Sequence, residues 1–195
     1  MTSVDAVTLE GTHVRLEPLT EAHHASLCAV GLVPEIWRWS PKPLLTPADM
    51  TAYIAFALAE QAQGRALPFV TVDKASGRVV GSTRFGNIDS ENRRVEIGWT
   101  WLAPACQRTA LNTEAKYLML RHAFETLGCV RVELKTDALN TRSRAAIARI
   151  GAHEEGTLRR HMVTASGRLR DTVYYSVIDA EWPEVKAQLA SRLGR

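Results

Sequence analysis

Three consecutive strands in the middle of the chain constrain the fold more than any other feature. Residues 67–72 and 78–85 are β-prone segments on either side of the turn at 75–77, a pattern that predicts a β-hairpin. The polar segment 87–92 is expected to loop back into a third strand, residues 93–102, which is rich in β-branched and aromatic side chains. Strands joined by short turns pair antiparallel. This meander therefore excludes an all-parallel, doubly wound α/β fold.

Helices and further strands are predicted on both sides of the meander. Thr20 and Thr46 are expected N-caps of helices 21–30 and 47–63, and Asn112 and Asn140 of helices 113–127 and 141–150. A last helix is expected at 182–193, and the remaining strands are expected at 13–17, 130–136, 152–163 and 170–178. The predicted class is α+β, with a mixed, mostly antiparallel sheet of about seven strands and about four to five helices.

Length and composition predict one domain over residues 1–195 and exclude several protein classes. Hydrophobic residues make up 46% and charged residues 23% of the chain, which is ordinary for a globular protein. Three scattered cysteines exclude a disulfide scaffold and a four-cysteine zinc site, and the histidines lack metal-ligand spacing, so no metal is expected. With no long apolar run and no signal-peptide pattern at the start, we expect a cytoplasmic protein without a membrane partner.

A net charge of +3 conceals an uneven distribution along the chain. Residues 1–92 carry a net −3 and residues 93–170 a net +7, mostly from arginine. Arginine suits contacts with phosphate or carboxylate groups, although an arginine-rich solvated surface explains the excess equally well. The basic residues interleave with strand and core patterns and no recognition motif accompanies them, so no nucleic-acid partner is expected.

The strand-loop-helix at residues 95–127 is the best candidate for a ligand site. Gln107 and Arg108 lie in the loop, just before a predicted helix N-terminus whose free amides and dipole attract anions. Neither the P-loop pattern nor the G-x-G-x-x-G dinucleotide pattern is present. An anion site of another type is therefore predicted, although many helix starts offer similar amides.

Five segments, together with the element order, resemble the GCN5-related N-acetyltransferases and, within them, the ribosomal-protein branch of RimJ and RimL. The segments are Leu9-Glu10-Gly11-Thr12-His13-Val14-Arg15-Leu16-Glu17-Pro18-Leu19, Val95-Glu96-Ile97-Gly98-Trp99, Asn112-Thr113-Glu114-Ala115-Lys116-Tyr117-Leu118, Asn140-Thr141-Arg142-Ser143 and Ile150-Gly151-Ala152. The resemblance covers residues 9–180. It implies direct acetyl transfer from acetyl-CoA to a primary amine through a tetrahedral intermediate, in a cleft where two central parallel strands splay apart.

The resemblance also implies which residues hold acetyl-CoA. Backbone groups of the strand would bind the pantetheine arm, the loop and helix start would bind the pyrophosphate, and Asn140 would bind the pantetheine again. The implied set is Trp99, Thr100, Trp101, Leu102, Gln107, Arg108, Thr109, Ala110, Leu111, Asn112, Thr113, Asn140, Ser143 and Arg144, with Arg142 as a further phosphate contact.

The phosphate loop departs from the family pattern. Ala110 stands where the family has glycine, and Asn112 where it has glycine or alanine. Ala110 therefore fits only if its φ is negative. These departures leave open a non-catalytic acyl-CoA-binding regulatory protein on the same fold.

Two side chains are candidates for proton transfer. Glu96 would take a proton from the acceptor ammonium, unless it is a structural partner of an arginine, and Glu133 is the second choice. Ile147 occupies the position of the family's usual tyrosine acid, so the resemblance transfers that role to Ser143, which could equally be an ordinary helical serine. A main-chain amide near residues 99–101 would bind the oxyanion.

The acceptor side is less defined by the sequence. The resemblance places Trp37 and Trp39 on the acceptor wall beside Glu96, and both could instead be core anchors. The acceptor is a protein N-terminus or a small amine. The acidic N-terminal half slightly favours a cationic one. Cys106 is expected to be a bystander. Whether the protein is a monomer or a homodimer that pairs through the late hairpin stays open.

Overall fold

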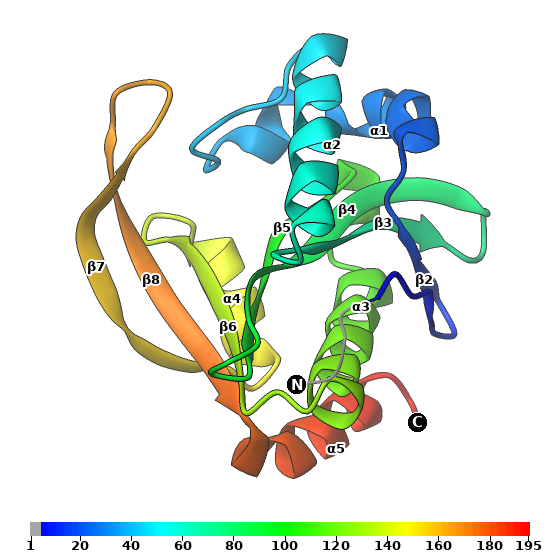
Figure 1. Ribbon diagram of the computed structural model, residues 1–195, viewed down its shortest axis with the longest axis vertical. Helices are drawn as coiled ribbons and strands as arrows, with labels where there is room; N and C mark the ends of the chain where they lie inside the picture. Colours follow the sequence, from blue (N-terminus) through cyan, green and yellow to red (C-terminus); the bar gives the residue numbers. More distant parts are fainter. Residues whose placement is uncertain (1–4) are drawn as a thin grey trace.

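A mixed β-sheet organises the chain, which a computed structural model describes for residues 5–195 (Figure 1). Within these residues the sheet has eight strands in the order β1-β2-β3-β4-β5-β6-β8-β7. β5 and β6 run parallel, whereas the other neighbours are antiparallel. The predicted α+β class is confirmed. The strand beyond the expected number is β1, which at two residues is too short to have a readable periodicity.

The strands have the following bounds. They are β1 (Leu9–Glu10), β2 (Val14–Pro18), β3 (Leu67–Asp73), β4 (Arg78–Asp89), β5 (Arg94–Leu102), β6 (Arg131–Asp137), β7 (His153–Val163) and β8 (Leu169–Ile178). The expected polar loop at 87–92 is only partly correct, because β4 continues to Asp89. Within this end of β4, Asn87 takes a left-handed φ of 48°.

The α-helices lie on both faces of the sheet. They are α1 (His24–Gly31), α2 (Pro47–Ala62), α3 (Ala110–Arg121), α4 (Thr141–Arg149) and α5 (Trp182–Arg192). Helices α1 and α2 lie together on one side of the sheet, and α3 and α5 pack against each other on the other side (Figure 1). A π-helical turn at His122–Thr126 extends α3 to the predicted end of that helix.

The start of α3 differs from the prediction. The helix begins at Ala110, and its N-cap is Thr109, whose Oγ1 accepts the amide of Leu111 at 3.3 Å. Asn112 is therefore not the cap and lies in the first turn. Thr109 competes successfully because it adopts the extended backbone that an N-cap needs, with φ −107° and ψ 179°.

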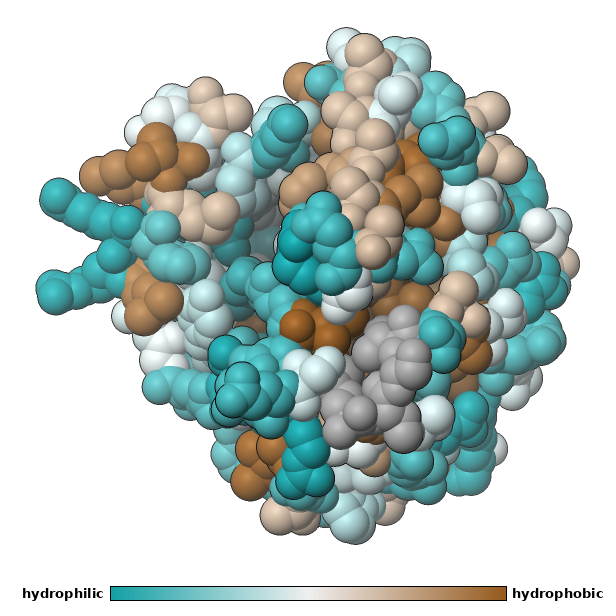
Figure 2. All heavy atoms as spheres, viewed as in Figure 1, coloured by the Kyte–Doolittle hydropathy of each residue, from teal (hydrophilic) through white to brown (hydrophobic). Residues whose placement is uncertain are grey.

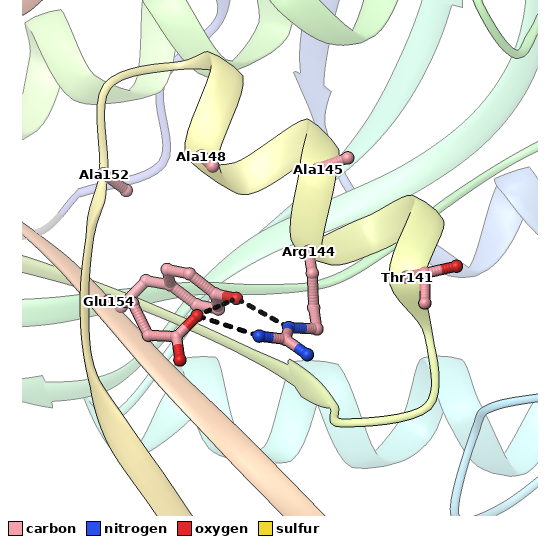
Figure 3. A pocket seen from close by; sticks show the side chains of 7 residues that line it. Thr141, Arg144, Ala145, Ala148, Ala152 and Glu154 are labelled. Atoms are coloured by element: carbon pink, nitrogen blue, oxygen red, sulfur yellow. Dashed lines mark hydrogen bonds and ion pairs between the residues drawn. The ribbon is translucent and has the colours of Figure 1, made fainter.

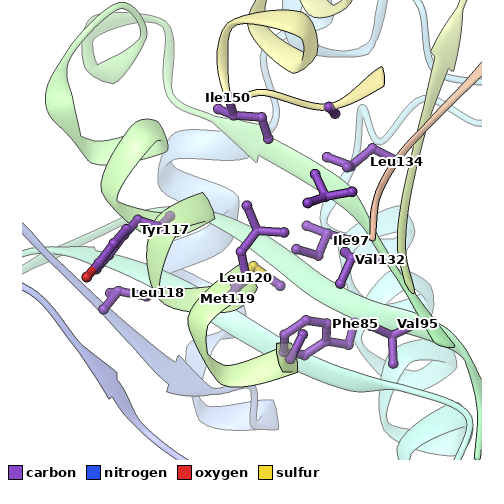
Figure 4. Packing of buried hydrophobic residues seen from close by; sticks show 14 of the residues in the cluster. Phe85, Val95, Ile97, Tyr117, Leu118, Met119, Leu120, Val132, Leu134 and Ile150 are labelled. Carbon is purple, nitrogen blue, oxygen red and sulfur yellow. The ribbon is translucent and has the colours of Figure 1, made fainter. Parts of the chain in front are cut away.

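Two apolar cores fill the space between the sheet and the helices. The larger core joins α3 to the central strands, with Phe85 and Ile97 facing Leu118 and Leu120 (Figure 4). The smaller core lies under α1 and α2 and includes Met50, Val70 and Trp101. The sheet is therefore buried on both faces where β4 and β5 cross the middle of the molecule.

Candidate active site

The two parallel strands at the centre of the sheet pair at one end and diverge at the other. In the described chain, residues 94–96 of β5 are in register with residues 131–133 of β6, and the last pair is Glu96 with Glu133. Beyond it β5 continues to Leu102 and β6 to Asp137, each paired on its outer side. The inner edges of both strands thus present main-chain donors and acceptors to a gap in the sheet. A divergence of two central parallel strands is the arrangement that the resemblance implied.

A β-bulge lies on β5 beside this gap. Ser82 is in register with Trp101 and Arg84 with Gly98, so Trp99 and Thr100 together oppose Thr83. Trp99 has a φ of 50°, which is uncommon for an aromatic residue. The bulge turns the main chain of β5 at the point where the strands separate, and it leaves the Trp99 side chain exposed.

A buried lysine supports the bulge from the α3 side. The Lys116 Nζ donates to Thr100 Oγ1 at 2.6 Å and lies 3.4 Å from Thr83 Oγ1. Thr83 and Thr100 also bond to each other at 2.7 Å. Burial lowers the pKa of Lys116 to about 7, because charging an amine away from water is costly. The two threonines are thus fixed from below by a side chain of α3.

The loop after β5 leads directly to the exposed start of α3. Gln107 Nε2 donates to the carbonyl of Leu102 at 2.9 Å, which ties the loop to the end of the strand. Arg108 has a left-handed φ of 64°, and Ala110 is already helical, so the alanine meets the requirement for a negative φ. Residues 108–110 at the start of α3 are exposed, and the first amides of a helix have no intrahelical carbonyl to bind; that of Leu111 is bound by Thr109 instead.

Glu114 anchors α3 to the N-terminal turn. Its carboxylate accepts the amides of Thr12, His13 and Val14 at 2.9, 2.6 and 2.7 Å, and it also pairs with Arg195. A Cβ on Gly11 would lie 2.4 Å from the Glu114 carboxylate, so only glycine permits this approach. Two of the segments that carry the family resemblance therefore meet in one buried contact.

Glu96 lies at the last strand pair before the gap and is 3% exposed. Its Oε2 accepts from Asn87 Nδ2 at 2.6 Å and pairs with Lys135 Nζ at 2.8 Å. Lys135, rather than the arginine considered from the sequence, is its charged partner.

Glu133, the second choice as a base, is held by two arginines. Its Oε1 accepts from Arg131 Nε at 2.9 Å and from Arg94 Nη1 at 3.2 Å. This carboxylate belongs to a surface ion-pair network, whereas that of Glu96 is buried beside the gap.

A family model described as an acetyltransferase (GNAT) domain matches residues 13–153. This chain belongs to the GNAT acetyltransferase family. It is 36% identical over 106 residues to YdaF of Bacillus subtilis (strain 168), named as a candidate ribosomal N-acetyltransferase. The match covers 54% of this chain and 57% of YdaF, so it spans little more than half of that relative.

Solved GNAT structures match nearly the whole chain. A GCN5-related N-acetyltransferase from Brucella melitensis has a TM-score of 0.89 and 34% identity, over 97% of this chain and 86% of that one. Mycobacterium smegmatis RimJ, solved in complex with CoA-disulfide, has a TM-score of 0.81 and 27% identity, over 97% and 93%. The resemblance to the family and to its ribosomal-protein branch is confirmed.

Helix α4 of this GNAT chain begins beside the open end of the gap. The Asn140 Oδ1 accepts the amide of Ser143 at 3.0 Å, which confirms Asn140 as an N-cap and places Ser143 in the first turn. Arg144 points elsewhere: it donates to Tyr175 Oη at 3.1 Å and to Glu154 at 3.1 Å. Its side chain is thus committed to β7 and β8, which does not suit the phosphate contact expected of it.

These three side chains line an open pocket of about 320 Å³ between α4 and the hairpin (Figure 3). The Tyr175 phenol donates to Glu154 at 2.9 Å, and burial raises the pKa of Tyr175. Since it is bounded by α4 and β7 rather than by α3 and β5, this pocket is separate from the gap in the sheet.

The two tryptophans expected at the acceptor wall have different surroundings. Trp37 is buried, packs against Trp101 with ring centroids 5.5 Å apart and the planes tilted by 57°, and donates to the carbonyl of Gly31 at 2.7 Å, as a core anchor does. Trp39 is half-buried, and the guanidinium carbons of Arg38 and Arg168 lie 5.0 and 5.8 Å from its ring centroid. Arg168 precedes β8, so Trp39 lies beside the β7–β8 hairpin, and Figure 2 shows a hollow between this hairpin and α2.

Sequence reasoning missed Lys116, Lys135 and Arg84 as parts of this region. Lys116 is a single lysine within a run of apolar helical residues, and Arg84 is a single arginine in an uncharged strand segment. Both could therefore have been noticed in the sequence as single charged residues within segments expected to be buried, because a buried charge usually has a specific partner. Nothing in the sequence indicates that Lys135 pairs with Glu96, because the pairing depends on the parallel register.

Among residues 5–195, no group of three or more His, Cys, Asp and Glu side chains is arranged to hold a metal ion. No helix in the same range is long and apolar enough to cross a membrane.

Proposed function

We propose that the protein is an acetyl-CoA-dependent N-acetyltransferase that transfers the acetyl group directly to a primary amine. The divergence of β5 and β6 beside the bulge at Trp99, leading to the exposed start of α3, carries this proposal. Membership of the GNAT family and the CoA-disulfide bound by the RimJ neighbour support it. Acceptors under this proposal are protein N-termini and small amines.

The donor set beside the gap suits acetyl-CoA, which would supply an acetyl group activated as a thioester. Main-chain groups of residues 99–102 would bind the extended pantetheine arm, because that inner edge of β5 has unpaired donors and acceptors. Amides at 109, 110 and 112, with Arg108 and Thr113 nearby, would bind the phosphates, whereas the amide of Leu111 is bound by the Thr109 cap. Asn140 and Ser143 would complete the site from α4, and no metal is required.

Glu96 is the proposed general base. An amine attacks only after its ammonium form has lost a proton, and a carboxylate at the edge of the gap can accept that proton directly or through water. The exposed main chain at the bulge would donate to the oxyanion that develops on the acetyl carbonyl. Ser143 is the proposed acid that returns a proton to the departing thiolate.

Thiol release from acetyl-CoA with a library of amines tests the activity, and calorimetric CoA binding tests the site. We expect Glu96→Gln to lower kcat at least about 100-fold with CoA affinity retained, and Glu133→Gln to leave kcat within a few-fold of the wild type. Ser143→Ala should lower kcat as well. Equal activity of Glu96→Gln and the wild type would remove Glu96 from the mechanism. Tight CoA binding without thiol release for any amine would favour the non-catalytic regulatory protein.

The assembly is also a proposal. β7 is the edge strand of the sheet beside β8, and its residues are nearly all exposed. Leu158 and Val163 on this strand are 47% and 68% exposed. We propose a homodimer that pairs through this edge, which light scattering after size-exclusion chromatography tests.

A further inference from the structure

Arg84 in the middle of β4 is a buried charge without a hydrogen-bonding partner. Its side chain is 1% exposed, and its Nε, Nη1 and Nη2 have no acceptor among residues 5–195. A guanidinium group carries five N–H donors and stays charged at any physiological pH. Nearly every buried charge in a folded protein is paired, so an arginine with all its donors free is an exception that needs a reason.

Three aromatic rings surround the guanidinium group of Arg84. Its Cζ lies 4.8 Å from the ring centroid of Tyr53, 4.9 Å from that of Trp99 and 5.9 Å from that of Phe56. The faces of these rings attract the cation, but they do not accept the hydrogen bonds that its N–H groups donate in the plane of the guanidinium group. Trp99 and Phe56 are themselves 38% and 53% exposed, so rotation of one exposed side chain gives access to the guanidinium edge. We call these three rings and Arg84 the arginine box.

The arginine box lies on the acceptor side of the proposed site. Arg84 is in register with Gly98, and Gly86, two residues along β4, is in register with Glu96. Side chains two residues apart share a sheet face, so Arg84 and the proposed base Glu96 lie on the same face. A Cβ on Gly86 would lie 2.3 Å from the Trp99 ring, and the missing side chain therefore leaves room for this wall of the box.

Nearby carboxylates of the chain are already engaged. Glu60 pairs with Arg65, whose Nε donates to it at 3.0 Å; this bond lowers the pKa of Glu60, and the charge of Arg84 acts in the same direction. Glu96 is held by Lys135 and Asn87. The described chain therefore offers no acceptor for the guanidinium edge.

We propose that Arg84 binds a carboxylate of the amine acceptor, so that the protein prefers amines that carry a carboxylate a few bonds from the nitrogen. This inference rests on the proposed function and specifies its acceptor. A carboxylate is planar and accepts two parallel N–H bonds from one edge of a guanidinium group. In Arg84 this edge has no acceptor and would be reached once an exposed ring of the arginine box rotates away. Such an acceptor is a free amino acid or a peptide with an acidic residue near its N-terminus.

Matched acceptors test this inference. Phenylalanine, phenylalaninamide and phenethylamine share a side chain and differ in the carboxylate, and tripeptides that begin with Ala-Glu or Ala-Gln repeat the comparison for a peptide. Of phenylalanine and the Ala-Glu tripeptide, the better acceptor should have a kcat/KM at least about 10-fold higher than that of its neutral counterpart with the wild-type protein. This ratio is expected for a charge-assisted hydrogen bond. The amino-acid arm and the peptide arm distinguish the two sources of the carboxylate.

Arg84→Met removes the charge and keeps much of the volume. It should abolish the carboxylate preference without lowering Tm, because an unpaired buried charge is replaced by an apolar group. Arg84→Lys keeps the charge but lacks the planar guanidinium group. The logarithm of its kcat/KM ratio for carboxylate over neutral acceptors should be less than half of the wild-type value. Arg78→Met, at the exposed start of the same strand, is the matched control and should leave preference and Tm unchanged.

Binding of N-acetylphenylalanine by calorimetry provides a readout that needs no turnover. Binding that is lost in Arg84→Met supports the inference even if no amine releases thiol, in which case the proposed function alone fails. Turnover of neutral and carboxylate amines at equal efficiency would overturn the inference and leave the function intact. A large loss of Tm in Arg84→Met with the preference retained would make the arginine box a structural element and would also overturn it.

Discussion

Replacing Glu114 by glutamine should destabilise the fold, because its carboxylate anchors α3 to the N-terminal turn. Glu114 is fully buried, and its two oxygens accept three main-chain amides at 2.6–2.9 Å besides pairing with Arg195. In glutamine one of these oxygens becomes an NH₂ group, which would point a donor at one or two amide donors. The change thus removes hydrogen bonds and leaves buried N–H groups without an acceptor.

The structure sets the expected size of this effect. Each hydrogen bond to a charged group contributes about 1.5–3 kcal/mol, and breaking one side of a buried ion pair costs about 3–5 kcal/mol. Glutamine keeps one acceptor oxygen, so we expect the free energy of unfolding to fall by about 2–4 kcal/mol. For a chain of this length that corresponds to a loss of about 4–16 °C in Tm.

Urea unfolding followed by circular dichroism measures this change directly, with the m-value as a check that the unfolded state is unaltered. Glu125→Gln is the matched control, because Glu125 also accepts from two donors, Trp182 and Lys186, but lies at the surface. That control should cost about 1 kcal/mol or less. If Glu114→Gln falls within about 1 kcal/mol of the wild type, the buried contact does not anchor α3 as described.

Three further substitutions test the buried lysine, the cap of α3 and the position of the Trp99 ring. Lys116 has a pKa lowered to about 7 against an ordinary 10.5, so between these values the unfolded chain binds more protons and stability should rise with pH. Lys116→Met should flatten this rise, measured as the urea midpoint against pH, and should raise stability near neutral pH. An unchanged slope in the variant would contradict this prediction. Thr109→Ala removes the α3 cap and should cost about 1 kcal/mol while weakening calorimetric CoA binding, an effect that an equal CoA affinity would disprove. Gly86→Ala should displace the Trp99 ring and shift tryptophan fluorescence, and an unshifted spectrum would show that the ring has room to spare.

The sequence was sufficient for the order and type of the elements because their signals are local. The turn at 75–77, the caps Thr46 and Asn140 and the late hairpin all lie where turn and cap residues predict them. The start of α3 was misplaced because Thr109 and Asn112 are both good caps, and only the backbone geometry selects between them.

Long-range contacts lay beyond sequence reasoning. The pairing of Glu96 with Lys135 depends on the register of two parallel strands that are more than thirty residues apart in the chain. The bulge at Trp99 could not be predicted, because nothing about a tryptophan favours a left-handed φ. Arg144 was expected at the cofactor because of its position after Asn140, but the direction of its side chain is set by Tyr175 and Glu154 on strands that come later in the chain.

The parallel pairing of β5 and β6 at residues 94–96 and 131–133 has a mechanical consequence. β5 and β6 are paired with each other at one end and diverge at the other, where each is held only by its outer neighbour, β4 or β8. The width of the opening is therefore governed by the bending of a few residue pairs far from its mouth, and a small change of twist at Glu96 and Glu133 becomes a larger displacement at Leu102 and Asp137. Adding or removing one pair at the paired end would alter the width of the mouth without changing any side chain that lines it.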